Sequence, residues 1–244
     1  PGDYEVLVKV MYCGFCNGSD FQIINNTMEK SEGLQDYPTI LGHEGSAYAV
    51  KLGKNVRHIQ LGDRFIHNNL RPDVGNGYTK TYGGMAEYGL VADHQAMAED
   101  GYQPDDMPFM NPQYPRYGKF GKIPSDFSLE GAAALLSMSE CLSMAENAGV
   151  DPSKKVLIYG DGPMGLGIAT YCRALGAKKV VIAGHHQNRL DLAKKIANVD
   201  RTIDSSKITM AEALDGELFD IVMDVAGFTS VLLEGSQFLY PFGR

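Results

Sequence analysis

The sequence predicts an α/β protein in which a β-rich first domain precedes a parallel sheet covered by helices on both faces. In the first half of the 244 residues, short runs of alternating apolar residues are bounded by glycines. In the second half, continuous apolar strands alternate with helix-like segments, which is typical of a parallel sheet buried on both sides. Because the pattern changes after the polar segment "DPSKK", we expect one domain at residues 1–150 and a second at residues 151–244.

The first half contains the alternating strand signals. The run "YEVLVKVMY" places Val6, Val8 and Val10 on one face of a strand. Further short runs bounded by turn residues lie at residues 45–53, 62–66 and 83–93. Short strands with glycine-rich turns indicate a small barrel or sandwich.

A different composition separates these strands from the second half. Residues 98–122 are rich in Pro, Tyr, Met and Gly, which predicts a long surface loop. A loop of this length is uncommon without a role, so it is either a lid or subunit contact or an ordered excursion without chemistry.

The second half follows the rhythm of a parallel sheet. Strands are expected at residues 156–160, 179–184 and 219–227, with a weaker candidate at 201–204, and helices are expected at 164–177 and 188–199. In the second helix, Leu190, Ala193 and Ile196 fall on one apolar side.

Composition excludes several classes of partner. The formal charge is −8, from 22 basic and 30 acidic residues, which argues against binding to nucleic acid or to an anionic membrane surface. The sequence contains no apolar run of membrane-spanning length, and its first residues do not resemble a signal peptide. Four cysteines do not form a disulfide scaffold in a chain of this length, so we expect a reducing, cytoplasmic location.

A glycine fingerprint lies between the first strand and first helix of the second half. Gly160, Gly162 and Gly165 match G-x-G-x-x-G in spacing and in context. The first glycine permits a tight turn, the second lets a pyrophosphate approach the backbone, and the third lets helix and strand pack closely. The fingerprint predicts a dinucleotide site, and the alternative is a turn that serves packing alone.

The residues after the second strand predict which dinucleotide binds. An acidic residue about 20 positions after the fingerprint usually binds the ribose 2′-hydroxyl. Gly184 stands there, followed by His185, His186 and Arg189, which can donate to a phosphate. We therefore predict that NADP(H) is preferred over NAD(H), with a solvated loop that still accepts NAD as the alternative.

Cys, His and Glu residues in the first half predict a metal site. His43 and Glu44 lie between two glycines just before a strand-like run, and Cys16 and Glu140 supply a thiol and a second carboxylate. One thiolate, one imidazole and one carboxylate form a Zn²⁺ ligand set with an open position for catalysis. The pair Cys13-x-x-Cys16 also allows a redox motif or half of a structural zinc site, but no second C-x-x-C completes it.

Together these motifs resemble those of a known family. The segments "EVLVKVMYCGFCNGSD", "LGHEG", "LGDRF", "GGMAEY", "SLEGAAALLS", "VLIYGDGPMGLG" and "FDIVMDVAG" follow one another in order. Over nearly all of its length the chain resembles the zinc-dependent medium-chain dehydrogenases/reductases, the alcohol and polyol dehydrogenase family. The resemblance implies a GroES-like catalytic domain, then a Rossmann domain, with the active site in the cleft between them. It also implies hydride transfer between a small alcohol, polyol or carbonyl substrate and a nicotinamide cofactor.

The resemblance assigns roles to individual residues. It implies that Cys16 and His43 bind a catalytic zinc, with Glu44 beside the metal as an alternating ligand or a supporting group. Ser19 would belong to the proton relay at the substrate oxygen, and Asp20 would orient His43. In the dinucleotide site, Pro163 and Met164 of the glycine turn and Val225 and Ala226 after the third strand complete the predicted contacts with the cofactor.

The third zinc ligand and the zinc stoichiometry also follow from the resemblance. The polyol-type pattern E-P-L-S resembles "ECLS", which favours Glu140 as the third ligand, with Cys141 as its rival. The cysteine-rich lobe that binds structural zinc in the family is absent, so one zinc per chain is expected. Cys13 and Cys172 are then expected to be core cysteines. The sequence departs from the family pattern at "NGS", which is one residue longer than usual, and at Gln22, where a titratable His often stands.

Three further expectations complete the interpretation. The chain resembles a family member that lacks both ends, so its Rossmann sheet is expected to be incomplete at the C-terminus. The full-length chain is expected to form a homo-oligomer, a dimer or a tetramer. The alternatives to a zinc-dependent enzyme are a non-catalytic nucleotide-binding protein of the same fold and a zinc-free reductase of the same superfamily.

Overall fold

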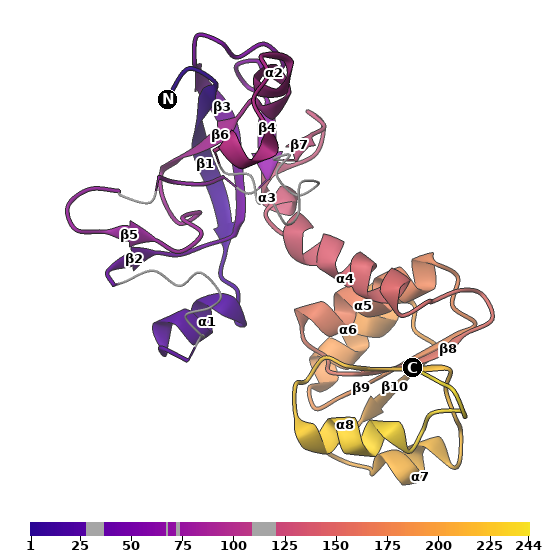
Figure 1. Cartoon of the computed structure of the whole chain (residues 1–244). Coiled ribbons are helices and arrows are strands. Elements are labelled where there is room, and N and C mark those ends of the chain that lie inside the picture. Colours follow the sequence, from indigo (N-terminus) through magenta and orange to yellow (C-terminus); the bar gives the residue numbers. More distant parts are fainter. Residues whose placement is uncertain (28–36, 67, 72–73, 109–120) are drawn as a thin grey trace. The chain divides into compact units, whose positions relative to one another are not determined.

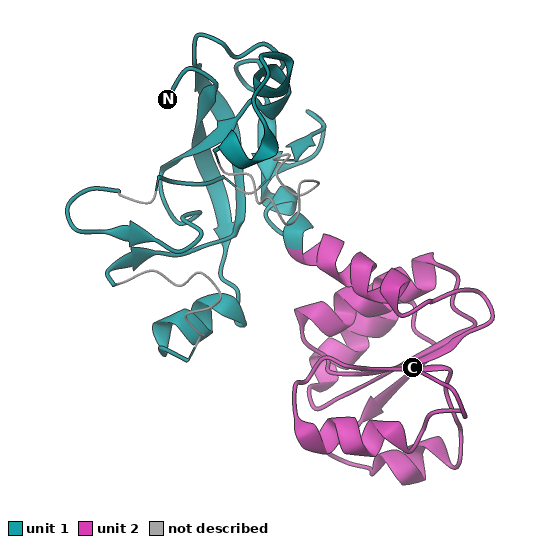
Figure 2. Ribbon diagram, in the orientation of Figure 1, with its two compact units in different colours: residues 1–136 teal, residues 137–244 magenta. Residues whose placement is uncertain are grey.

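The computed structural model describes residues 1–27, 37–66, 68–71, 74–108 and 121–244 of the protein. It divides into two compact units, unit 1 at residues 1–136 and unit 2 at residues 137–244, shown in different colours in Figure 2. The division falls inside helix α4 (Leu135–Asn147), upstream of the predicted boundary at Val150. No helix among the described residues is both long enough and apolar enough to cross a membrane.

Unit 1 is built on a five-stranded antiparallel sheet with the strand order β6–β1–β3–β4–β7 (Figure 1). Its strands are β1 (Glu5–Gly14), β3 (Glu44–Leu52), β4 (Arg64–Ile66), β6 (Tyr88–Ala92) and β7 (Lys122–Ile123). A separate parallel pair joins β2 (Thr39–Ile40) to β5 (Thr79–Lys80). The short strand runs predicted for the first half are thereby confirmed.

The core of unit 1 lies on one face of this sheet. Val6 and Val8 of β1 are fully buried, and Val10 packs against them from a partly buried position. They meet Phe65 of β4 and Val91 of β6 in one apolar cluster. The alternation of "YEVLVKVMY" therefore marks the buried face of β1, as predicted.

Short helices connect the strands of unit 1. They are α1 (Ser19–Ile24), α2 (His94–Glu99), the 3-10 helix η2 (Pro104–Asp106) and α3 (Leu129–Ala132). The loop predicted at residues 98–122 therefore contains the end of α2, all of η2 and the start of β7 in its described parts. Residues 109–120 lie outside the described residues, so a lid or contact role for this loop stays a prediction.

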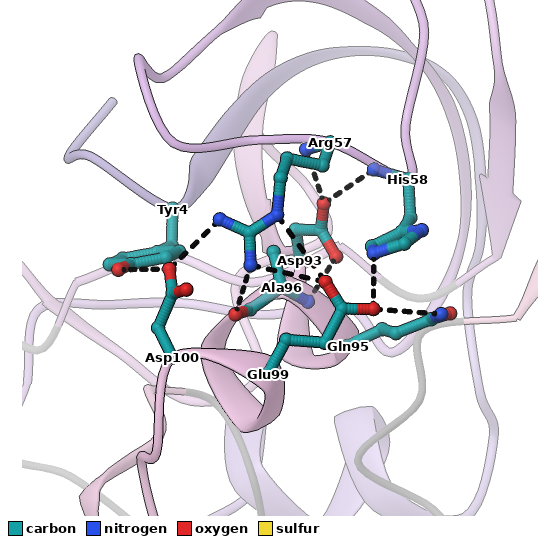
Figure 3. Close-up of polar contacts among 8 residues, drawn as sticks. All are labelled: Tyr4, Arg57, His58, Asp93, Gln95, Ala96, Glu99 and Asp100. Atoms are coloured by element: carbon teal, nitrogen blue, oxygen red, sulfur yellow. Dashed lines mark hydrogen bonds and ion pairs between the residues drawn. The ribbon is translucent and has the colours of Figure 1, made fainter.

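A polar network holds α2 against the segment between β3 and β4 (Figure 3). The buried carboxylate of Asp93 caps α2 by accepting from Ala96 N at 3.0 Å, and it also accepts from the backbone N–H groups of Arg57 and His58 at 2.8 and 2.7 Å. Arg57 in turn donates to the backbone oxygen of Ala96 at 2.7 Å and to Glu99 at 3.1 Å. One buried acid therefore joins two segments that lie 35 residues apart.

Unit 2 contains a four-stranded parallel sheet with the order β10–β9–β8–β11. Its strands are β8 (Lys155–Tyr159), β9 (Lys179–Gly184), β10 (Arg201–Asp204) and β11 (Ile221–Asp224). Its helices are α5 (Pro163–Ala174), α6 (Gln187–Ala197), α7 (Met210–Leu214) and α8 (Thr229–Ser236), besides most of α4. The weaker strand candidate at residues 201–204 is β10.

Two apolar cores cover the two faces of this sheet. In β8, Val156 and Ile158 point into the core formed with α5 and α6, whereas Leu157 and Tyr159 point into the core formed with α7. Figure 1 shows α5 and α6 on one side of the sheet and α7 and α8 on the other. The strands are continuously apolar because both of their faces are buried, which confirms the predicted α/β arrangement.

One detail of α6 differs from the prediction. Leu190 and Ala193 are fully buried, but Ile196 is 52% exposed, and Ala197 is buried in its place. Positions 190, 193 and 197 share the i, i+3, i+7 face that packs on the sheet, and Ile196 lies outside that stripe.

Candidate functional site

Three potential metal ligands meet at the end of the β1–β3 pair in unit 1. Cys16 lies in the turn that follows β1, His43 directly precedes β3, and Glu44 is the first residue of β3. One ligand atom from each residue lies within 4.8 Å of the other two, and all three residues are half-buried. A thiol, an imidazole and a carboxylate in this arrangement fit a zinc ion, which prefers N and S ligands and accepts carboxylate oxygen.

The antiparallel pairing of β1 and β3 brings these segments together. Gly14, the last residue of β1, lies opposite Glu44 in the register of the pair. A Cβ atom at position 14 would lie only 2.5 Å from Oε2 of Glu44, so the glycine leaves the space that this carboxylate occupies. Gly42, with φ of 95°, similarly permits the tight approach of the His43 segment to Cys13 and Met85.

Asp20 ties the two halves of the cluster to each other. It is fully buried in the first turn of α1, and its carboxylate accepts from Cys16 N at 2.9 Å and from Gly42 N at 3.4 Å. Its Oδ1 also lies 3.9 Å from Nδ1 of His43. A buried acid between the thiol turn and the imidazole is placed to orient the ring, as expected for a partner of a metal-binding histidine.

The other residues predicted for this chemistry lie on two helices. Ser19 is the first residue of α1 and is half-buried, and Gln22 is exposed on the same helix. Glu140 is exposed on α4 in unit 2, and its role as the third ligand stays a prediction. Its rival, Cys141, is fully buried in the core of unit 2, where its thiol lies 3.6 Å from the carbonyl oxygen of Met164.

The two cysteines expected to be core residues differ in burial, because Cys172 is buried in a core whereas Cys13 is only half-buried. Burial, aided by the charge of Asp20, raises the pKa of the Cys13 thiol to about 11, so that this thiol is protonated at neutral pH. Cys172 is fully buried beneath the sheet of unit 2, where burial raises its pKa to about 12. Burial likewise raises the pKa of Cys141 to about 11, with Glu140 contributing.

A cavity of about 460 Å³ opens at the carboxyl ends of the strands in unit 2. The residues predicted to bind the cofactor that line it are Gly160, Gly162, Gly184, His185, His186, Val225 and Ala226. The cavity lies where β8 has β9 on one side and β11 on the other, which is the switch point of an open parallel sheet and the usual place for a ligand. Of the other predicted contacts, Pro163 is the first residue of α5, and Arg189 lies on α6.

The three glycines of the fingerprint have distinct surroundings. Gly160 has a φ of 120°, a conformation that favours glycine. A Cβ atom at Gly165 would lie 1.9 Å from the backbone oxygen of Gly160, whereas one at Gly162 would meet no atom within 4 Å. The space in front of Gly162 therefore remains open to a ligand, and Gly165 brings α5 close to the turn.

The sequence interpretation overlooked Asp161, the residue between the first two glycines. It lines the cavity, is 5% exposed, and accepts from the backbone N–H of His186 at 2.7 Å. A Cβ atom at Gly184 would lie 2.4 Å from the Asp161 carboxylate, so the two positions compete for one space. The premise that no acid lies beside Gly184 is therefore wrong. The sequence does contain a signal for Asp161, namely an acid inside the glycine turn together with a second strand that ends in glycine.

Comparison with known protein families agrees with both units. Residues 2–100 match the alcohol dehydrogenase GroES-like domain, and residues 163–244 match the zinc-binding dehydrogenase domain. The antiparallel sheet with its Cys, His and Glu cluster and the parallel sheet with its glycine turn define the two parts of such a protein. The chain therefore belongs to the zinc-type medium-chain dehydrogenases.

Curated relatives of this chain are named as enzymes of sorbitol or D-xylulose. Sorbitol dehydrogenase of Arabidopsis thaliana is 26% identical over 95% of this chain, and D-xylulose reductase A of Aspergillus oryzae is 27% identical over 98%. Sorbitol dehydrogenase of Ovis aries is 32% identical over 80% of the chain. The chain spans 63%, 66% and 52% of the lengths of these three relatives, respectively.

Solved structures share the fold. A zinc-binding dehydrogenase of Sinorhizobium meliloti bound to NADP superposes with a TM-score of 0.76 at 23% identity, over 100% of this chain and 68% of that one. An alcohol dehydrogenase of Escherichia coli complexed with NADH superposes with a TM-score of 0.74 at 23% identity, with the same coverage. The two neighbours carry different nicotinamide cofactors, so the likeness of fold does not decide between NAD and NADP.

Proposed function

We propose that the protein is a zinc-dependent oxidoreductase that transfers a hydride between an alcohol or polyol, or its carbonyl product, and a nicotinamide cofactor. The observation that carries the proposal is the convergence of Cys16, His43 and Glu44, whose ligand atoms lie within 4.8 Å of one another. A zinc-free reductase would leave this donor set without a purpose. Among substrates, polyols are favoured because the relatives include sorbitol dehydrogenases and a D-xylulose reductase.

The residues of unit 1 would hold and orient the metal. Cys16 and His43 are its ligands in this proposal, with Glu44 as a ligand or as a supporting carboxylate. When bound there, zinc supplies Lewis acidity, which lowers the pKa of an alcohol oxygen. Asp20 fixes the cluster by accepting from Cys16 N and by facing His43 Nδ1, so the ligands are positioned before the metal arrives.

Unit 2 would bind the cofactor, which supplies the hydride acceptor or donor. The pyrophosphate would approach Gly162, where the backbone is open and α5 begins at the next residue. The free N–H groups at the start of a twelve-residue helix favour an anion there. The adenosine ribose would lie beside Gly184, close to the carboxylate of Asp161, and this carboxylate would affect whether NAD or NADP binds more tightly.

Several parts of the proposal rest on the sequence alone. Glu140 as third ligand, Ser19 as part of a proton relay and one zinc per chain all stay predictions. So do a cytoplasmic location and a homo-oligomer of the full-length protein. The burial of Cys141 in a core, with its thiol against a carbonyl oxygen, favours Glu140 over Cys141 as the ligand from α4.

Steady-state kinetics tests the proposed function. The protein at its full natural length is purified without chelator and assayed with polyols, simple alcohols and threonine, each with NAD and with NADP. We expect turnover with a polyol, and we expect a His43→Asn variant to lose at least about 100-fold in kcat/KM because the ligand set is broken. His58→Asn, which changes a histidine of the polar network around α2, serves as the matched control and should retain activity. Absence of turnover with every substrate, or equal activity after complete removal of zinc, would refute the proposal.

A further inference from the structure

Asp161 occupies a place in unit 2 that another side chain usually fills. In dinucleotide-binding folds the acid that binds the adenosine ribose stands at the end of the second strand, about 20 residues after the glycine turn. Here that strand, β9, ends on Gly184, which has no side chain. A Cβ atom built at Gly184 would lie 2.4 Å from both Cγ and Oδ2 of Asp161. The carboxylate therefore lies in the space into which a side chain at position 184 would project.

The Asp161 carboxylate is fixed in this place and borders the cavity. Its Oδ2 accepts from His186 N at 2.7 Å, and its Oδ1 lies 3.0 Å from His186 Nδ1. Burial raises the pKa of this acid, but the hydrogen bonds from His186 outweigh burial, so the pKa falls below its ordinary value. An ionised carboxylate has about four lone-pair positions, so the contacts with His186 leave acceptor capacity for a ligand in the cavity.

Two of the three basic side chains that favoured a 2′-phosphate, those of His186 and Arg189, already lie against this acid. Nη1 of Arg189 lies 3.7 Å from Asp161 Oδ1, and the ring of His186 faces the same carboxylate. Of these two residues only His186 lines the cavity. A 2′-phosphate would thus meet a buried carboxylate, whereas a ribose hydroxyl would meet a hydrogen-bond acceptor.

We propose that Asp161, supplied by the glycine turn and not by the end of β9, recognises the adenosine ribose and makes the protein prefer NAD(H) over NADP(H). This inference rests on the proposed function, because it assumes that the cavity holds a nicotinamide dinucleotide. It replaces the preference for NADP(H) that the sequence predicts from Gly184, His185, His186 and Arg189. Asp161 acts here as a specificity-determining residue that accepts a hydrogen bond from the 2′-hydroxyl.

Calorimetric binding of cofactor fragments tests the inference without a catalytic readout. The probes are ADP-ribose, 2′-phospho-ADP-ribose and 2′-deoxy-ADP-ribose, and the protein has its full natural length. Wild-type protein should bind ADP-ribose at least about 10-fold more tightly than either analogue, because a hydrogen bond to a charged group is lost or a like charge is introduced. The 2′-deoxy probe needs no variant, so this arm of the test holds even where a substitution disturbs folding.

Four variants separate recognition of the ribose by Asp161 from a purely structural role of this residue. Asp161→Asn should reduce the ratio of the affinity for ADP-ribose to that for 2′-phospho-ADP-ribose by about 10- to 100-fold, or invert it. The control Asp191→Asn, the same change on the exposed side of α6, should leave this ratio unchanged. Gly184→Asp alone should destabilise the protein, because the new side chain meets Asp161. The double variant Asp161→Ala, Gly184→Asp moves the acid to the end of β9 and should restore both stability and the preference for ADP-ribose.

The possible outcomes distinguish the inference from the proposed function. Tighter binding of 2′-phospho-ADP-ribose by wild-type protein, or an unchanged ratio in Asp161→Asn, would overturn the role of Asp161 while leaving a dinucleotide-binding dehydrogenase intact. Equal affinity for ADP-ribose and 2′-deoxy-ADP-ribose would overturn it as well. Failure of every probe to bind wild-type protein would instead refute the cofactor part of the proposed function.

Discussion

Gly14 lies directly opposite Glu44 where β1 and β3 pair, and the missing side chain of Gly14 makes room for the Glu44 carboxylate. A Cβ atom at position 14 would lie 2.5 Å from Oε2 and 3.2 Å from Cβ of Glu44. The carboxylate is the far end of a flexible side chain, so it would move more readily than the backbone. The position of one of the three candidate ligands thus depends on a residue that cannot itself bind metal.

The first prediction follows from this relationship. Gly14→Ala should retain the fold but displace the Glu44 carboxylate, and zinc affinity should fall about 10-fold, as it does when groups around a metal site are disturbed. Competition with a chromophoric chelator measures the affinity, and thermal unfolding of the zinc-free protein checks the fold. The control is the same change in a Glu44→Gln background, where it should have little further effect. An equal loss of zinc affinity in the wild-type and Glu44→Gln backgrounds would show that the alanine acts on the backbone and not through Glu44.

The second prediction contrasts two glycines of the same fingerprint. Gly165→Ala should lower the free energy of unfolding by at least about 3 kcal/mol, because its Cβ would lie 1.9 Å from the backbone oxygen of Gly160. Gly162→Ala should lower the free energy of unfolding by less than about 1 kcal/mol, since the φ of −73° at this position suits alanine and no atom lies within 4 Å of the added carbon. It should nevertheless weaken ADP-ribose binding at least about 10-fold, because the methyl group occupies the approach of the pyrophosphate. Urea unfolding and calorimetry measure the two quantities, and wild-type affinity in Gly162→Ala would contradict the assigned geometry.

The third prediction concerns the buried acid that caps α2. Asp93→Ala should lower the free energy of unfolding by about 2–4 kcal/mol, because the N–H groups of Arg57, His58 and Ala96 lose their acceptor. The control variant Asp105→Asn, at an exposed residue, should have a free energy of unfolding within about 0.5 kcal/mol of wild type. Chemical denaturation at neutral pH gives these values, and a loss below about 1 kcal/mol for Asp93→Ala would contradict the network in Figure 3.

The same acid predicts a pH dependence with a definite sign. Burial raises the pKa of Asp93, but the three backbone N–H groups outweigh burial and hold the pKa below its ordinary value of 3.8. The ionised form therefore stabilises the fold above pH 3.8, and this contribution is lost as the pH falls below 3.8 through the lowered value. The stability difference between wild type and Asp93→Asn should accordingly shrink between neutral pH and about pH 3. A difference that is constant across this range would rule out the predicted linkage.

Local patterns predicted the features of this chain that depend on few residues. The alternation around Val6 and Val8 and the continuous apolar strand at residues 156–160 follow from which faces are buried, so periodicity alone was sufficient. The environments of Gly160 and Gly165 agree with their expected roles because a strand–turn–helix is a local motif. Cys16 and His43 were chosen as candidate ligands from their residue types and motifs; the structure places them close together with Glu44, and their binding of zinc stays a prediction.

Three features were not predicted, each for a different reason. Asp161 and Gly184 meet only because β8 and β9 are neighbours, and neither residue reports that contact in its own local pattern. The helix that begins after Asp93 was missed although Asp is a common N-cap residue, because residues 94–97 were assigned to no element and a loop was expected from residue 98. Ile196 was placed on the buried side since apolar character does not tell which of two adjacent stripes meets the sheet.

The zinc content of protein purified without chelator tests the central claim most directly. Metal analysis of wild type, Cys16→Ala and Cys172→Ala compares the same change at a proposed ligand and at a buried core cysteine. We predict about one zinc per chain in wild type and in Cys172→Ala, and a content near zero in Cys16→Ala, because the residues that the structure describes contain one such ligand set and a thiolate is its strongest zinc donor. A stoichiometry near two, or a Cys16→Ala variant that retains its zinc, would contradict the account.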